Sequence, residues 1–260
     1  MRKAYADIPF GQIHYVEEGK GECVLLLHQS PLSLDEYRDV IPILGEKYRV
    51  VAMDTPGYGN SDGLKSYMPM EGYSRCVSDF MDALGIPKAS VVGSHTGAAI
   101  AVELAVTAPE RVEKLILNGC PEYEPEVRKS RLVDTKYDPI KIAADGSHFL
   151  RIWQIAKDWS PNFTLESWHR WVVDYLNAGE FDAHQALFRY LIEERLPLVK
   201  MPTLFISGTE DVFHHRLTAS ANLIPGSKTK IIEGGGIVIG YERAESFAQA
   251  IREFLEDNNN

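Results

Sequence analysis

Cysteine is scarce in this chain. Only three occur among its 260 residues, Cys23, Cys76 and Cys120. Their odd number and wide spacing match neither a disulfide framework nor a metal site, since both need characteristic sets of cysteines. We therefore expect the three thiols to stay reduced, as is usual in a cytoplasmic protein.

Long apolar runs and basic clusters are also missing. No run approaches the roughly 20 residues that a membrane-spanning helix needs, and residues 1–10 lack the apolar segment of a signal peptide. The formal net charge is −10, whereas proteins that bind duplex nucleic acid present a basic face to the phosphates. We expect a cytoplasmic protein whose partner is a small molecule, not a membrane or a nucleic acid. The oligomeric state does not follow from these features.

The chain does have a regular alternation of strand and helix patterns. A half-exposed strand over residues 12–16 is followed by short apolar runs typical of buried strands, over 24–27, 50–53, 90–92, 115–117, 203–207 and 228–232. Apolar residues at helical spacing lie between or after them, over 35–44, 73–84, 98–107 and 244–255. This order predicts an α/β fold, with a mostly parallel doubly wound sheet and helices on both of its faces.

The alternation stops over residues 121–195. This span holds no buried-strand run, contains all four tryptophans and has helical periodicity, as over 181–191. We expect it to form a helical cap, inserted late in the sheet, over the carboxyl edge where open α/β sheets bind ligands. Residues 1–120 and 196–256 then form the core. The polar residues 257–260 are expected to be a disordered tail.

Two glycines frame a sharp turn after the predicted strand at 90–92. Gly93 and Gly97 stand two residues before and two after His95, and glycines at this spacing let a strand pass directly into a helix. The spacing places His95 at the head of the turn, partly exposed in the cleft, with strained backbone around it. Ser94, one residue earlier, should face away.

Over nearly its whole length the sequence resembles the α/β-hydrolase superfamily. The resemblance rests on residues 25–31, 51–62, 91–99 and 203–211, which include a histidine after the third strand, an Asp-x-x-Gly-x-Gly segment and a Gly-x-x-Asp segment. It implies a cofactor-free enzyme that binds a substrate oxygen in an oxyanion hole of backbone N–H groups, here those of Gln29 and Thr96. It also implies that Asp211 is the catalytic acid and that His28 orders the oxyanion loop at the substrate pocket.

The chain departs from this family at two positions. His95 stands where the family has its nucleophile, and Ile237 stands where the family has its histidine, on the wall of the expected pocket. No histidine follows His215. A serine nucleophile needs a base to take its proton, so the acyl-serine mechanism is excluded at these positions. We expect His95 to act as base or nucleophile and Asp211 to orient it through Nδ1–H.

A metal site is not expected. His214 and His215 follow Asp211 closely, but adjacent histidines normally point apart and no His-x-x-x-His pair is present.

Three functions remain open at this point. The resemblance implies hydrolysis of an ester, a lactone or a C–C bond in a small carbonyl compound. Proton abstraction by a lyase suits a lone histidine equally well, because it needs a base and an oxyanion hole but no serine. A non-catalytic receptor is the third possibility, since some members of the superfamily bind ligands after losing the triad histidine. The fate of the ligand distinguishes them.

Overall fold

The computed structural model describes residues 1–133, 141–160, 163–178 and 183–257. It contains an eight-stranded sheet in the order β1-β2-β4-β3-β5-β6-β7-β8. The strands β3 to β8 are parallel, while β1 and β2 are antiparallel to their neighbours. Their bounds are Arg2–Ile8, Gly11–Glu18, Cys23–Leu27, Arg49–Met53, Ala89–Ser94, Val112–Asn118, Thr203–Gly208 and Lys228–Ile232. The predicted α/β class and mostly parallel sheet are confirmed.

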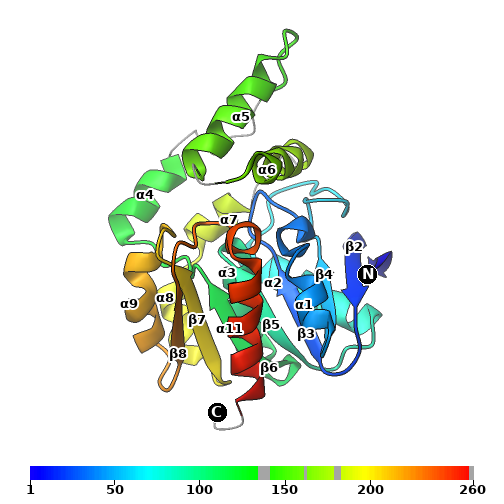
Figure 1. Cartoon of the computed structure of the whole chain (residues 1–260), viewed down its shortest axis with the longest axis vertical. Coiled ribbons are helices and arrows are strands. Elements are labelled where there is room, and N and C mark those ends of the chain that lie inside the picture. The colour runs from blue at the N-terminus through cyan, green and yellow to red at the C-terminus, as the bar shows by residue number, and fades with distance from the viewer. Residues whose placement is uncertain (134–140, 161–162, 179–182, 258–260) are drawn as a thin grey trace.

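Helices cover both faces of the sheet. One apolar cluster joins the sheet to α2 (Met70–Ala83) and α3 (Thr96–Thr107), and a second joins its other face to α1 (Ile41–Gly45) and α11 (Ala244–Glu256). Figure 1 shows α11 lying in front of the strands. Two short helices, α9 (Leu217–Asn222) and α10 (Ile239–Glu242), lie in the connections on either side of β8. None of the helices in the described part of the chain is long and apolar enough to cross a membrane.

The helix predicted over residues 35–44 is divided. The structure has a 3-10 turn, η1 (Leu34–Tyr37), and then the separate helix α1. Pro42 explains the division, because a proline lacks the N–H for the helical ladder and its ring clashes with the carbonyl four residues earlier. Ser33 begins η1, with its Oγ accepting the N–H of Asp35 at 3.2 Å.

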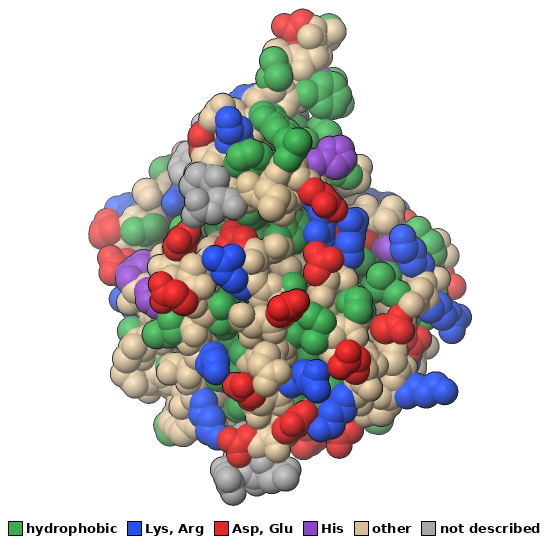
Figure 2. Space-filling view, viewed as in Figure 1, with side chains coloured by type: hydrophobic (Ala, Val, Ile, Leu, Met, Phe, Trp, Pro, Cys, Tyr) green, Lys and Arg blue, Asp and Glu red, His purple; other side chains and the backbone are tan. Residues whose placement is uncertain are grey.

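The described residues between β6 and β7 contain helices and no strand. These helices are α4 (Pro125–Val133), α5 (Ser147–Trp159), α6 (Leu165–Asn177), α7 (His184–Arg189) and α8 (Ile192–Arg195). Figure 1 shows α5 and α6 beyond the edge of the sheet at which the parallel strands end, with α5 projecting outward. Hydrophobic side chains gather on this projection in Figure 2, where Phe149 is 52% and Leu150 75% exposed. Part of the predicted helix at 181–191 is present as α7, while residues 181 and 182 lie outside the described residues.

The last part of this span packs with the sheet. Apolar residues of α7, α8 and the following turn belong to the same cluster as β5 and α3. Glu103 of α3 is 1% exposed and accepts hydrogen bonds from Arg195 Nε at 3.0 Å and from the Tyr190 hydroxyl at 2.8 Å. Apolar residues of α7 and α8, which precede residue 196, therefore share one hydrophobic cluster with the sheet.

Asp257 is fixed by two contacts, although the sequence predicts a disordered tail from this residue onward. Its carboxylate pairs with Lys228 of β8, and its carbonyl accepts from Nζ of Lys114 of β6 at 2.9 Å. Two lysines of the sheet therefore contact the residue that follows α11. Residues 258–260 lie outside the described residues.

The buried carboxylate of Glu103 yields a prediction about stability. Arg195→Ala leaves this carboxylate with the Tyr190 hydroxyl as its remaining partner, and we expect it to lower the free energy of unfolding by about 2 kcal/mol. The exposed pair of Lys230 and Glu253 provides the control, because Lys230→Ala should cost less than about 0.5 kcal/mol. Urea denaturation measures both, and equal losses would show that the buried ion pair does not hold α8 to α3.

Candidate active site

The turn between β5 and α3 places His95 at its head. His95 has φ 47° and ψ −108°, and among the described residues it is the one non-glycine with positive φ. The flanking glycines are required by close approach: a Cβ on Gly93 would lie 2.3 Å from the Gly97 carbonyl oxygen, and a Cβ on Gly97 would lie 2.0 Å from that of Leu27. Residue 95 therefore has a positive φ in a tight passage from strand to helix.

Ser94 and His95 point to opposite sides of this turn. Ser94 is fully buried behind the strand, where its Oγ accepts from the Tyr37 hydroxyl at 3.0 Å and from Asn118 Nδ2 at 3.3 Å. His95 lines the cavity described below, but it is only 6% exposed. The expectation of a partly exposed histidine was therefore wrong, because neighbouring side chains enclose the ring.

The structure brings His95 into contact with Asp211. The Nε2 atom of His95 lies 2.8 Å from Oδ2 of Asp211, so the contact uses Nε2 and not the predicted Nδ1. Asp211 follows β7, and its other oxygen accepts the N–H of Phe213 at 2.7 Å. The carboxylate is thus held by the backbone as well as by the imidazole.

Gly119 provides the space that the imidazole occupies. It follows β6 with φ +56°, and a Cβ at this position would lie 2.3 Å from Nε2 of His95. Its N–H donates to the Ile206 carbonyl at 3.0 Å, which holds the segment in place. The absence of a side chain at residue 119 therefore permits the His95–Asp211 contact.

The pKa of His95 is raised. Burial acts to lower this pKa, but it is outweighed by the charge of Asp211 and its hydrogen bond, with further contributions from the charge of Glu36 and a hydrogen bond to the backbone of Ile237. The imidazole therefore keeps its proton to a higher pH than an isolated histidine, whose pKa is 6.5.

Gln29, the first predicted oxyanion donor, donates its backbone N–H to a buried carboxylate. Its backbone N–H donates to Oε2 of Glu36 at 2.9 Å, while its side-chain Nε2 donates to the Ile237 carbonyl at 2.8 Å. Glu36 is fully buried, and burial raises its pKa to about 7. The sequence pattern does not single out Glu36, because an acid in a predicted amphipathic helix normally lies on the solvated face.

Thr96, the second predicted donor, is the first residue of α3 and lines the same cavity as His95. The first N–H groups of a helix have no acceptor within the helix, so the Thr96 amide suits a ligand oxygen.

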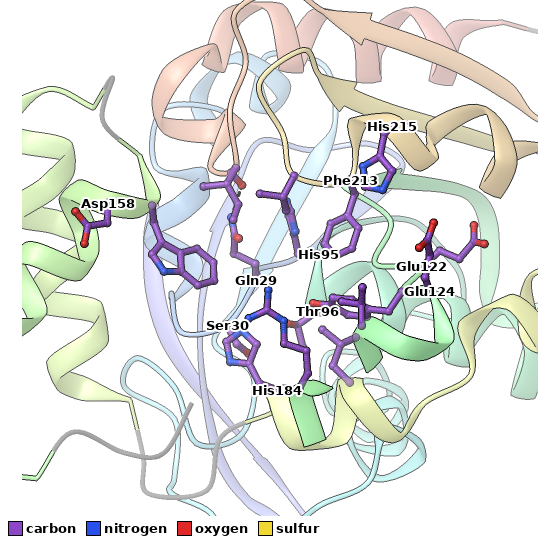
Figure 3. A pocket seen from close by; sticks show the side chains of 17 residues that line it. Gln29, Ser30, His95, Thr96, Glu122, Glu124, Asp158, His184, Phe213 and His215 are labelled. Carbon is purple, nitrogen blue, oxygen red and sulfur yellow. Dashed lines mark hydrogen bonds between the residues drawn. The ribbon is translucent and has the colours of Figure 1, made fainter. Parts of the chain in front are cut away.

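The cavity beside His95 has a volume of about 410 Å³. Ile237 lies on its wall, as predicted, and Figure 3 shows Gln29 and His95 near its centre, with Asp158 on one side and Glu122 and Glu124 on the other. Its lining residues are Gln29, Ser30, His95, Thr96, Glu122, Tyr123, Glu124, Val127, Arg131, Asp158, Trp159, His184, Leu187, Val212, Phe213, His215 and Ile237.

His28 is absent from this lining, although the family resemblance implies a place at the pocket. Its Nδ1 lies 2.9 Å from the Gln29 carbonyl, and its Nε2 accepts the N–H of Thr55 at 2.9 Å. Burial lowers its pKa, so the ring is neutral. These contacts fix the backbone that leads into Gln29.

The two adjacent histidines after Asp211 separate, as expected. His215 lines the cavity, while Nδ1 of His214 lies 3.3 Å from Ser207 Oγ. Within the described ranges, no group of three or more potential ligands has metal-binding geometry.

The fit of His95 over Gly119 yields a second prediction. Gly119→Ala should lower the free energy of unfolding by about 2–4 kcal/mol, because it adds overpacking against the imidazole to the cost of a positive φ. Gly85 is a matched control, with φ +61° and no neighbouring atom within 4 Å of the place that a Cβ would take. Gly85→Ala should cost about 1–2 kcal/mol in the same denaturation assay. Equal costs would mean that Gly119 serves only the backbone.

The charge of Asp211 yields a third prediction. In the wild-type protein the His95 pKa lies above 6.5, and Asp211→Asn should lower it by about one pH unit or more because burial is then opposed by less negative charge. NMR titration of the eight histidine rings, with the His95 signal assigned from its loss in His95→Gln, measures this change. A His95 pKa that is the same in both proteins would show that Asp211 does not stabilise the imidazolium.

Comparisons with known proteins identify the fold family. A family model described as the alpha/beta hydrolase fold matches residues 22–244. The chain is 38% identical over 119 residues to 2-hydroxy-6-oxo-6-phenylhexa-2,4-dienoate hydrolase of Comamonas testosteroni, which covers 41% of this chain and 39% of the relative. It is 34% identical over 110 residues to haloalkane dehalogenase 2 of Mycobacterium bovis, over 42% and 38% of the two chains. These matches span about two fifths of each relative's length.

Solved structures match over the whole fold. The enol-lactonase from Burkholderia xenovorans LB400 has a TM-score of 0.79 at 23% identity, covering 98% of this chain and 100% of that one. A hydrolase from Pseudomonas aeruginosa PA01 has a TM-score of 0.84 at 19% identity, covering 98% and 99%. With the family match over residues 22–244, the parallel sheet and the turn after β5, this chain belongs to the α/β-hydrolase fold family.

Proposed function

We propose that this protein is a cofactor-free hydrolase of a small carbonyl compound, an ester, a lactone or a compound cleaved at a C–C bond. The observation that carries the proposal is the buried His95–Asp211 pair beside the cavity, at the head of the turn after β5. The relatives support the reaction class, because their names describe a dienoate hydrolase and a dehalogenase.

In the proposed mechanism His95 acts as a general base toward water. With Nε2–H held by Asp211, the neutral imidazole would exchange the Ile237 carbonyl for water at its second nitrogen. That nitrogen then takes a proton from the water as its oxygen attacks the substrate carbonyl. The backbone N–H groups of Thr96 and Gln29 would stabilise the resulting oxyanion. The tetrahedral intermediate then collapses, and the imidazolium returns its proton to the leaving group. Attack by the imidazole itself, through an acyl-imidazole, would use the same residues.

We also propose that the helices between β6 and β7 act as the cap of this site. Side chains from α4, α5 and α7 line the cavity together with His95, among them Val127, Trp159 and His184. The core at residues 1–120 and 196–256 would then supply the reacting groups, and residues 121–195 would shape the space for the substrate.

A ligand-binding protein is the second candidate. Ile237 packs in an apolar cluster with Ile152 and Trp171 of α5 and α6, and its aliphatic side chain offers no base to the cavity. Such a protein would bind the same small compounds and release them unchanged. A lyase that uses His95 to abstract a proton would release the products of elimination or bond cleavage without adding water.

Turnover of a panel of aryl esters, lactones and vinylogous β-diketones, followed by mass spectrometry, tests the proposal. We expect His95→Ala to lower turnover by about 10²–10⁴-fold, the usual contribution of one positioned base. Ser94→Ala is the neighbouring control and should stay within about tenfold of the wild type, since Ser94 is buried behind the turn.

The opposite result, in which Ser94→Ala abolishes turnover and His95→Ala retains it, would refute the assignment of His95. If the wild-type protein converts none of the compounds and calorimetry finds one that binds intact, the receptor replaces the hydrolase. A product without the mass of added water indicates the lyase.

A further inference from the structure

Glu36 is a buried carboxyl group next to the proposed reaction centre. It lies in η1, is fully buried, and its Oε2 accepts the backbone N–H of Gln29 at 2.9 Å. The side-chain Nε2 of Gln29 lies 3.4 Å from the other carboxylate oxygen. The proposed mechanism assigns this acid no role, although it occupies the amide that the mechanism needs.

The groups that face Glu36 come from three elements. Ser94 and His95 approach from the turn after β5, where the Ser94 hydroxyl and the charge of His95 both act to lower the Glu36 pKa. The Tyr37 phenol belongs to η1 itself, and the Tyr241 phenol approaches from α10. Both phenols have raised pKa values, chiefly through burial. Of these groups, His95 is the one that can carry positive charge.

An amide N–H has one hydrogen to donate, so Glu36 and a substrate oxygen compete for that of Gln29. A hydrogen bond to an ionised acceptor is roughly twice as strong as one to a neutral acceptor. An ionised Glu36 therefore holds the amide firmly, whereas a protonated carboxyl competes with the substrate on nearly equal terms. Because burial raises the pKa of Glu36 to about 7, both forms are populated near neutral pH.

We propose that Glu36 is a positioning residue that controls the Gln29 amide: its carboxylate withholds this N–H from a bound carbonyl oxygen, and its protonated form releases it. The step is a proton equilibrium with solvent and breaks no other bond. Its consequence for turnover rests on the proposed hydrolase function, while its effect on the Gln29 amide does not.

The protonation states of Glu36 and His95 together decide which form of the site is active. Neutral His95 with protonated Glu36 holds one proton, as does the imidazolium with the carboxylate. Only the first of these two states combines a free base with an available amide. Turnover should therefore fall as the pH rises above the Glu36 pKa of about 7 and the pair loses its last proton, which the raised pKa of His95 helps to retain.

NMR of the Gln29 amide tests the proposal without a substrate. The chain has five glutamines, so selective ¹⁵N-glutamine labelling gives few signals, and loss of one in Gln29→Met assigns it. In the wild-type protein the Gln29 amide proton should move upfield on acidification, with a midpoint at the Glu36 pKa of about 7. In Glu36→Gln, which cannot ionise, it should not titrate across that range.

Glu242 provides a matched control. Its carboxyl group is half-buried with a pKa raised to about 7, and it accepts the N–H of Gly236, next to Ile237, instead of the N–H of Gln29. Glu242→Gln should leave the Gln29 titration unchanged. A Gln29 amide that does not titrate in the wild type, or that titrates equally in Glu36→Gln, overturns the proposal. If Glu36→Gln does not fold, a Gln29 amide that does not titrate in the wild type would still overturn the proposal.

Kinetics provide the second arm. For any compound that the wild type converts, kcat should decline on the alkaline side as the Glu36–His95 pair loses its last proton, and Glu36→Gln should lose this decline while remaining active. A decline that persists in Glu36→Gln would contradict the proposal even if hydrolysis is established. If the wild type converts nothing, the hydrolase proposal fails, and the amide titration still decides the role of Glu36.

Discussion

The hydrogen bond between His95 and Asp211 is the contact on which the site depends. His95 follows β5 and Asp211 follows β7, with β6 between them in the sheet. Neighbouring strands lie about 4.8 Å apart, so the two residues must bridge about 10 Å of sheet edge. The imidazole crosses the end of β6 at Gly119, where the absence of a Cβ leaves room for Nε2. Three strand ends therefore act together to hold one ring.

The family resemblance predicts a triad histidine at the position of Ile237, which in this chain contributes a backbone carbonyl and an apolar wall. The imidazole that contacts Asp211 comes from the turn after β5. Holding a histidine at φ 47° costs about 1–3 kcal/mol. The hydrogen bond from its own N–H to the Asn118 carbonyl at 2.9 Å helps to fix that backbone.

Much of this fold could be predicted from local pattern. Each predicted sheet strand from residue 24 onward exists, and the helix predicted over residues 73–84 is present as α2 (Met70–Ala83). Residues 2–8 were not predicted as a strand because β1 is an edge strand with most of its residues exposed. The glycine spacing around His95 located the turn, since only a tight turn needs glycine at both flanks.

The parts that could not be predicted depend on contacts distant in sequence. Glu36 and the Gln29 amide pair through a turn that the helical periodicity of residues 35–44 does not reveal. The need for glycine at residue 119 likewise cannot be predicted until the His95 ring is placed beside it. Asp257 is ordered by Lys114 and Lys228, which are far away in the chain. Local patterns therefore locate the reacting groups, whereas the residues that tune them emerge from the tertiary structure.

Chemical rescue tests most directly whether the imidazole at residue 95 is the reacting group. Glycine tolerates a positive φ, so His95→Gly keeps the turn and leaves a space of imidazole size beside Asp211. With a compound that the wild type converts, we expect negligible turnover by His95→Gly alone and a rate that rises with added imidazole until the space is saturated. Turnover by His95→Gly without imidazole, or a folded variant that imidazole does not reactivate, would contradict a reacting role for His95.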